Sequence, residues 1–184
     1  MKKTALLIVC GTLLSGVQLS FAQEMPEMPP PEKEHEWLQK FVGEWETQTE
    51  IHIPNGETMN ASGSESIRSI GGFWIVAQGE SKNSAMEFSS LLTLGYDPPS
   101  QKYIGTWVDS MNSHLWEYDG TVDQTGKILT LLTEGPCPTK PGETMKFKEE
   151  IEFKSPDHRV FTSSYQDESG KWTTGVVSHS RRKK

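Results

Sequence analysis

The chain has 184 residues, a length that fits one domain and is sufficient to bury a hydrophobic core. It carries 25 Asp and Glu side chains against 18 Lys and Arg, which gives a formal charge of −7 at pH 7. This acidic balance argues against nucleic acid and anionic membrane surfaces as partners, because both are themselves negatively charged.

The first 22 residues predict a secretory signal peptide. Lys2 and Lys3 precede an apolar stretch over 4–19, and Ser20-Phe21-Ala22 forms a small-x-small cleavage site. The apolar stretch is too short for a stable membrane span, and no later segment is apolar enough to replace it, so membrane insertion is not expected. The sequence therefore predicts an exported protein, either periplasmic or secreted.

Residues 23–31 (QEMPEMPPP) predict a polar, proline-rich leader that cannot pack a core. Met25, Met28 and His35 carry groups that suit copper(I), but a leader without a metal is the favoured interpretation. Removal of the signal peptide leaves Cys137 as the one thiol, so no disulfide within the chain is expected. We interpret it as an incidental loop thiol. An intermolecular disulfide or a reactive thiol is the alternative, and a homodimer is left open.

A short amphipathic helix is predicted over 31–42. Acidic residues lie near its start, Lys40 lies near its end, and Gly43 is a natural stop signal. Its apolar residues share one face, which needs an apolar surface to cover, such as one end of a barrel. These residues are Trp37, Leu38 and Phe41.

Strands and turns are predicted after Gly43. The alternation in 45–53 is typical of a half-buried strand, with His52 on the solvent side. Roughly ten short strands without intervening helices favour an all-β fold: an antiparallel meander closed as a barrel or folded as a sandwich, in one domain spanning 32–184. The further β-rich runs, separated by turn residues, span 61–70, 73–79, 87–94, 102–109, 114–122, 128–134, 145–153, 159–165 and 172–180.

The two ends of the domain favour the closed barrel. Closure pairs the first strand with the last and places Trp45 near Arg181, whose guanidinium would stabilise the barrel by about 0.5–2 kcal/mol by stacking on the indole. Gly43 and Trp45 at one end with Arg181 at the other are typical of lipocalin-like barrels. The alternative is that Arg181 is one more solvated charge in the basic tail.

Four segments carry a resemblance to a known family. They are Phe41-Val42-Gly43-Glu44-Trp45, Leu94-Gly95-Tyr96-Asp97, Tyr103-Ile104-Gly105-Thr106-Trp107-Val108-Asp109-Ser110-Met111 and Pro141-Gly142-Glu143-Thr144-Met145-Lys146-Phe147-Lys148. In these segments the chain resembles the bacterial domain-of-unknown-function family fifteen-seventy-nine. The resemblance implies a calycin-like barrel, often exported, and implies no activity.

The central segment supplies the candidate ligand-binding residues. Two rows of side chains on adjacent strands would form an aromatic wall with one carboxylate and one imidazole if both point inward, which suits a small apolar ligand with a polar group. The alternative is that the aromatic rings simply fill a packed structural barrel or interaction module. The rows are Tyr103, Trp107 and Asp109, then His114, Trp116 and Tyr118, and Trp74 allows the same two interpretations.

Two further functions stay open as alternatives. Asp109 and His114 could form an acid-base pair of an enzyme, although neither nearby serine has a visible oxyanion hole. Some distant calycin-like barrels bind haem through a histidine of their last strand, and the resemblance makes His179 the candidate here, facing inward if Arg181 does.

No histidines, cysteines and carboxylates have metal-ligand spacing, and no catalytic residue or resident cofactor is predicted. Glu149, Glu150 and Glu152 are interpreted as outer-face charges that protect a strand from aggregation. The favoured interpretation is an exported binding protein for a small apolar or aromatic molecule.

Overall fold

The computed structural model describes residues 29–53, 56–83, 86–138 and 140–184. The predicted signal peptide and the leader residues Met25 and Met28 lie outside this part of the chain. Within it, residues Pro31–Lys184 form one compact unit. No helix among the described residues is long and apolar enough to cross a membrane.

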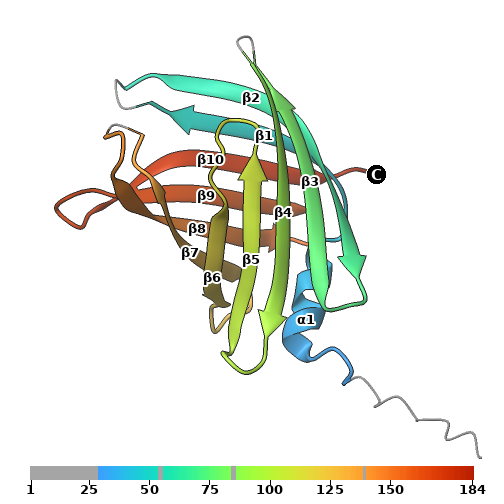
Figure 1. The fold of residues 1–184 in the computed structure, drawn as a ribbon. Helices are drawn as coiled ribbons and strands as arrows, with labels where there is room; N and C mark the ends of the chain where they lie inside the picture. Colours follow the sequence, from blue (N-terminus) through green and yellow to red (C-terminus); the bar gives the residue numbers. More distant parts are fainter. Residues whose placement is uncertain (1–28, 54–55, 84–85, 139) are drawn as a thin grey trace, which may run out of the picture. The chain divides into compact units, whose positions relative to one another are not determined.

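The unit is a closed antiparallel barrel of ten strands (Figure 1). Each strand pairs with its neighbours in the chain, and β1 pairs with β10 to close the sheet. The all-β barrel predicted from the sequence is therefore confirmed. The elements are α1 (Lys33–Leu38), the 3-10 turn η1 (Gln39–Phe41), β1 (Gly43–His52), β2 (Thr58–Ile70), β3 (Trp74–Lys82), β4 (Glu87–Asp97), β5 (Lys102–Asp109), β6 (Trp116–Val122), β7 (Ile128–Pro136), β8 (Thr144–Ser155), β9 (His158–Gln166) and β10 (Trp172–Arg182).

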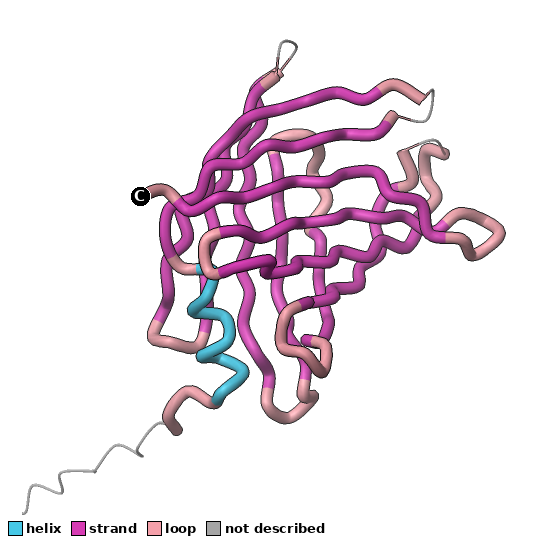
Figure 2. The backbone as a smooth tube through the Cα atoms, turned by 180° about the vertical axis from the view of Figure 1, so that it is seen from behind, coloured by secondary structure: helices cyan, strands magenta, loops and turns pink. Residues whose placement is uncertain are grey.

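The helix packs at one end of the barrel, as Figure 2 shows from behind. The indole nitrogen of Trp37 donates to the carbonyl of Gly126 at 2.8 Å. The side-chain amide of Gln39 donates to the carbonyl of Gly72 at 3.2 Å. We call this the closed end. The opposite end, which we call the mouth, is formed among the described residues by 53, 56–57, 83, 86, 110–115, 137–138, 140–143 and 167–171.

The hydrophobic core lies at the closed end. Trp37, Phe41 and Phe153 meet edge to face, with ring centroids 4.9–5.8 Å apart. Such contacts add to the stabilisation that comes from burying apolar surface. The buried side chains packed with them include Leu38, Trp45, Ile67, Ile75, Leu94, Leu129, Leu131 and Ile151.

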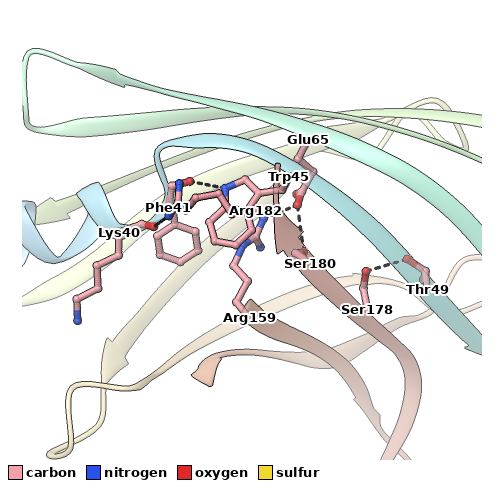
Figure 3. Close-up of polar contacts among 9 residues, drawn as sticks. All are labelled: Lys40, Phe41, Trp45, Thr49, Glu65, Arg159, Ser178, Ser180 and Arg182. Atoms are coloured by element: carbon pink, nitrogen blue, oxygen red, sulfur yellow. Dashed lines mark hydrogen bonds and ion pairs between the residues drawn. The ribbon is translucent and has the colours of Figure 1, made fainter. Parts of the chain in front are cut away.

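Trp45 joins the first strand to the last (Figure 3). Its side chain is fully buried, and its indole nitrogen donates to the carbonyl of Phe41 at 2.7 Å. The guanidinium of Arg182 lies over the ring, 4.2 Å from its centroid. That guanidinium also donates to the carbonyls of Lys40, Val42 and Pro156 at 3.0, 2.6 and 3.2 Å. The bonds to Lys40 and Val42 connect the chain before β1 to the end of β10, and the bond to Pro156 connects the end of β10 to the turn between β8 and β9.

The predicted closure is present, but the arginine is Arg182 and not Arg181. The register pairs Trp45 with Arg182, so that Arg181 lies opposite Glu46 and is exposed. Because successive side chains of a strand point to opposite faces, an error of one residue reverses the assignment of every side chain near the end of β10.

Gly43 is required where the chain enters β1. Its φ is 134°, and a Cβ atom there would lie 2.5 Å from Nη1 of Arg182. Gly43→Ala is therefore expected to lower the free energy of unfolding by about 1–3 kcal/mol, measured by urea denaturation. Gly142→Ala is the control, because Gly142 also has a positive φ, 89°, but an added Cβ meets nothing within 4 Å. Equal losses in the two variants would contradict the proposed clash.

Candidate functional site

The barrel interior holds a cavity of about 430 Å³ between the core and the mouth. This volume lies within the range of small-molecule pockets in proteins. Its presence means that the described side chains do not fill the barrel completely. The wall of the cavity is mostly apolar. The main apolar lining residues are Phe88, Leu92, Trp107, Trp116, Phe147 and Phe161.

Two tryptophans of the wall are held in fixed positions. Trp107 stacks on Phe88, with centroids 6.3 Å apart, and its indole nitrogen donates to Oδ2 of Asp109 at 3.0 Å. Trp116 lies over Gly135, where an added Cβ would come within 2.1 Å of the ring. It also meets Phe147 edge to face at 5.0 Å. Such contacts restrict both indoles, so that they form a preformed surface.

Four of the sequence-predicted site residues line this cavity: Trp107, Asp109, Trp116 and Tyr118. Burial raises the pKa of Tyr118, and the nearby carboxyl groups of Glu149 and Asp109 raise it further. Tyr118 is thus neutral at physiological pH and lies within electrostatic reach of two acidic groups.

Trp74 and Tyr103 do not line the cavity, contrary to expectation. Trp74 is 38% exposed, because it precedes the fully buried Ile75 and so points outward, where it covers Gly95. Tyr103 does point inward, but it belongs to the closed-end core, where its hydroxyl donates to the carbonyl of Glu34 at 3.2 Å.

Asp109 and His114 bind other partners instead of each other. Asp109 accepts hydrogen bonds from Trp107 and from the backbone nitrogen of Met111, the latter at 2.8 Å. His114 lies in the loop before β6, where its Nε2 donates to the carbonyl of Glu134 at 3.3 Å and its ring packs on Trp116. His114 is not part of the cavity lining, and the acid-base arrangement of the enzyme hypothesis is not formed.

His179 points away from the cavity. It is exposed and stacks on His158, with Nε2 of His158 3.1 Å from Nδ1 of His179. Its neighbours Ser178 and Ser180 are the residues that face inward. The condition set for His179, an inward Arg181, is not met: both side chains face outward, and His179 offers no ligand to a haem in the barrel.

His35 serves the fold. It is 3% exposed, its Nδ1 accepts from the backbone nitrogen of Glu32 at 3.0 Å, and its Nε2 donates to the carbonyl of Tyr96 at 3.1 Å. Both nitrogens are therefore occupied in holding α1, which argues against the copper interpretation. Among the described residues, no group of His, Cys, Asp and Glu is arranged to hold a metal ion.

A comparison with models of protein families assigns the chain to one family. The family model described as "Protein of unknown function (DUF1579)" matches residues 30–182. The chain belongs to the DUF1579 family. None of the curated proteins matches it significantly.

Solved structures with the same fold have low sequence identity to this DUF1579 protein. Rv2717c from M. tuberculosis is 13% identical, with a TM-score of 0.61 over 83% of this chain and 99% of the other. The S-type phycobiliprotein lyase CPES from Guillardia theta is 18% identical, with a TM-score of 0.53 over 84% and 99%. At such identities the likeness shows a shared fold alone.

Glu149 is the site residue that the sequence interpretation placed wrongly. It was expected on the outer face, but it is only 6% exposed and lines the cavity. The reason is its parity: Glu149 shares a side of β8 with Phe147 and Ile151, which face inward. The alternation of apolar residues in 145–153 carries this signal. Glu150 and Glu152 are on the other parity, with partly exposed side chains.

The carboxyl group of Glu149 is incompletely paired. Its Oε1 accepts a hydrogen bond from Oγ of Ser163 at 3.1 Å, and its Oε2 is buried with no hydrogen-bond partner. Burial raises the pKa of Glu149 to about 8, although the bond from Ser163 opposes the shift. An unpaired buried carboxyl group is costly, so its presence on a cavity wall points to a role in the site.

The floor of the cavity carries a buried ion pair in this DUF1579 protein (Figure 3). Arg159, whose side chain is 5% exposed, donates to Oε2 of Glu65, and its guanidinium lies 4.9 Å from the ring centroid of Trp45. Oγ of Ser180 approaches the same glutamate oxygen at 3.4 Å. The carboxylate of Glu65 is therefore paired with a cation, whereas the carboxyl group of Glu149 has no cation beside it among the described residues.

Proposed function

We propose that this DUF1579 protein is a binding protein that holds a small, mainly apolar or aromatic molecule in its barrel. The observation that carries the proposal is the cavity of about 430 Å³ lined by aromatic side chains. Burial of a ligand against such a surface stabilises a complex by about 25 cal/mol per Å² of apolar area removed from water. The cavity surface is mostly apolar although polar side chains also line it, which favours a ligand with an apolar body and a polar group.

The mouth supports the same function. Met86 and Met111 line the cavity and are 40% and 54% exposed. Methionine side chains adapt their shape to different apolar partners, so both suit an entrance. Trp45 and the helix close the other end, which leaves the mouth as the route for a ligand.

We further propose that the protein acts after export, in the periplasm or outside the cell. The proposal rests on the sequence of residues 1–22, with its basic start, apolar centre and small-x-small cleavage site. An exported protein of this kind would capture its ligand outside the cytoplasm.

The native mass of the chain isolated from its own host tests the binding function. We expect the non-denaturing mass to exceed the mass after denaturation by that of one small molecule. A naphthyl alcohol, naphthylethanol, is then added in excess to the ligand-free protein, and its uptake is expected as a second mass shift. A mass equal to that of the polypeptide alone in both experiments would contradict the proposed function.

A further inference from the structure

The unpaired oxygen of Glu149 defines the polar part of the site. The side chain lines the cavity, more than nine-tenths of the residue is buried, and Oε2 has no hydrogen-bond partner. In its ionised form the carboxyl group is an acceptor only, so a ligand with a hydrogen-bond donor would satisfy Oε2 of the carboxylate. A ligand with acceptor groups alone would leave the ionised carboxylate without a partner for Oε2.

Aromatic rings line the cavity together with this oxygen. Trp116, Tyr118, Phe147 and Phe161 contribute to the same wall, and the flanking positions of Glu149 on its side of β8 hold Phe147 and Ile151. Ring faces carry partial negative charge and attract cations, most strongly where water is excluded. The aromatic rings and the carboxyl group therefore both favour a positively charged ligand group that can donate a hydrogen bond.

The distribution of charged side chains in the cavity also favours a cationic ligand. Glu65 is neutralised by Arg159, whereas no ion pair joins Asp109 or Glu149 to a cation among the described residues. Lys82 lines the cavity only as an exposed residue near the mouth. An anionic ligand would therefore meet no unpaired cation in the cavity interior, whereas a cationic ligand would supply the opposite charge that neither carboxyl group has.

We propose that the ligand is an organic cation, an aromatic or aliphatic amine whose ammonium group donates a hydrogen bond to Oε2 of Glu149 while its apolar body packs against the aromatic wall. This inference rests on the proposed binding function and adds the chemical class of the ligand. A charge-assisted hydrogen bond between an ammonium and a carboxylate is about twice as strong as a neutral one.

Binding of the cation is coupled to loss of a proton. The raised pKa of Glu149, about 8, keeps this group protonated at pH 7. The other ionisable groups that line the cavity are Glu65, Glu80, Lys82, Asp109, Tyr118 and Arg159, of which Glu80 and Lys82 are exposed. Formation of the ammonium–carboxylate pair requires the proton of Glu149 to leave for solvent. Affinity for an ammonium is thus expected to rise between pH 6 and pH 8, and affinity for a neutral molecule to stay constant.

Three probes that share one naphthyl body test the charge preference. They are naphthylethylammonium, naphthylethanol and naphthylacetate, titrated calorimetrically at pH 8. We expect the ammonium to bind about tenfold more tightly than the alcohol, and the acetate to bind weakest. Titrations at pH 7 in two buffers of different ionisation enthalpy are expected to show release of nearly one proton with the ammonium and none with the alcohol.

Glu149→Gln removes the charge and keeps the shape. The variant is expected to lose about tenfold in affinity for the ammonium, together with the proton release, and to bind the alcohol within twofold of the wild type. Glu152→Gln is the control, because Glu152 lies on the same strand but pairs with Lys154 outside the barrel, at 2.6 Å. Retained alcohol binding also shows that the variant is folded.

The possible failures are distinguishable. Equal affinity for the ammonium and the alcohol in the wild type, or an equal loss for both in Glu149→Gln, would overturn the cation inference and leave the binding function standing. Absence of binding for all three probes would overturn the binding function and, with it, the inference.

Discussion

Arg182→Ala is expected to lower the free energy of unfolding by about 2–4 kcal/mol, measured by urea denaturation at neutral pH. The substitution removes three hydrogen bonds to the carbonyls of Lys40, Val42 and Pro156, and also the contact with the face of Trp45. The ion pair with Asp157 adds little, because that carboxylate is 76% exposed.

Arg181→Ala is the matched control, since it removes the same side chain one residue earlier. Arg181 is exposed and lies opposite Glu46, so its loss is expected to change stability by less than about 0.5 kcal/mol. A larger effect at position 181 than at 182 would contradict the register of β1 and β10. The pair of variants therefore tests barrel closure as well as the contribution of one residue.

Glu149→Gln is expected to make the protein more stable in alkaline solution, by about 3–5 kcal/mol at pH 9. The folded protein holds a proton on Glu149 up to a pKa of about 8, whereas the unfolded chain loses it near the ordinary value of 4.5. Between these values the unfolded state binds fewer protons, so the wild type loses stability as pH rises. Above pH 8 the loss is complete and constant.

Urea denaturation at intervals from pH 4 to pH 9 measures this effect. The wild-type free energy of unfolding should fall across the window relative to that of Glu149→Gln, and the two should approach each other below pH 5. Glu152→Gln, with its partly exposed side chain, should follow the wild type. Parallel curves for the wild type and Glu149→Gln would show that the carboxyl group is not desolvated as described.

The sequence predicts the strands well because their alternation and turn residues are local signals. Each of the predicted β-rich runs overlaps an observed strand, and the helix ends at Leu38 with a 3-10 turn to Phe41, close to the predicted stop at Gly43. The family resemblance and the need to close the sheet then lead to the barrel. The strands and the helix could be predicted because each depends on a periodicity contained in a single segment of the chain.

The direction of side chains near strand ends could not be obtained in the same way. Arg181 and Arg182 are adjacent and identical, and only the pairing of Trp45 with Arg182 distinguishes them. The register of β10 against β9 also shifts between Thr174 and Val176. The placement of His179 depended on that of Arg181, two residues along the same strand, so the error of one residue at the arginine applies to both.

The cavity depends on contacts between strands that are distant in sequence. A barrel of ten strands is wider than one of eight, whose interior side chains suffice to fill it. Small residues also occupy inward positions on several strands, which leaves space between the walls. Among them are Ala61, Ala77, Gly79, Ser90, Ser163 and Ser178. The size of each residue is visible in the sequence, but its direction follows only from the closed sheet.

Calorimetric titration of naphthylethanol into two leucine variants tests the binding cavity most directly. Leu92 lines the cavity, whereas its neighbour Leu91 is 40% exposed on the outer face. Leu92→Trp is expected to weaken binding at least tenfold because the larger side chain takes up part of the cavity, whereas Leu91→Trp is expected to match the wild type. Equal binding by all three proteins would contradict a ligand site inside the barrel.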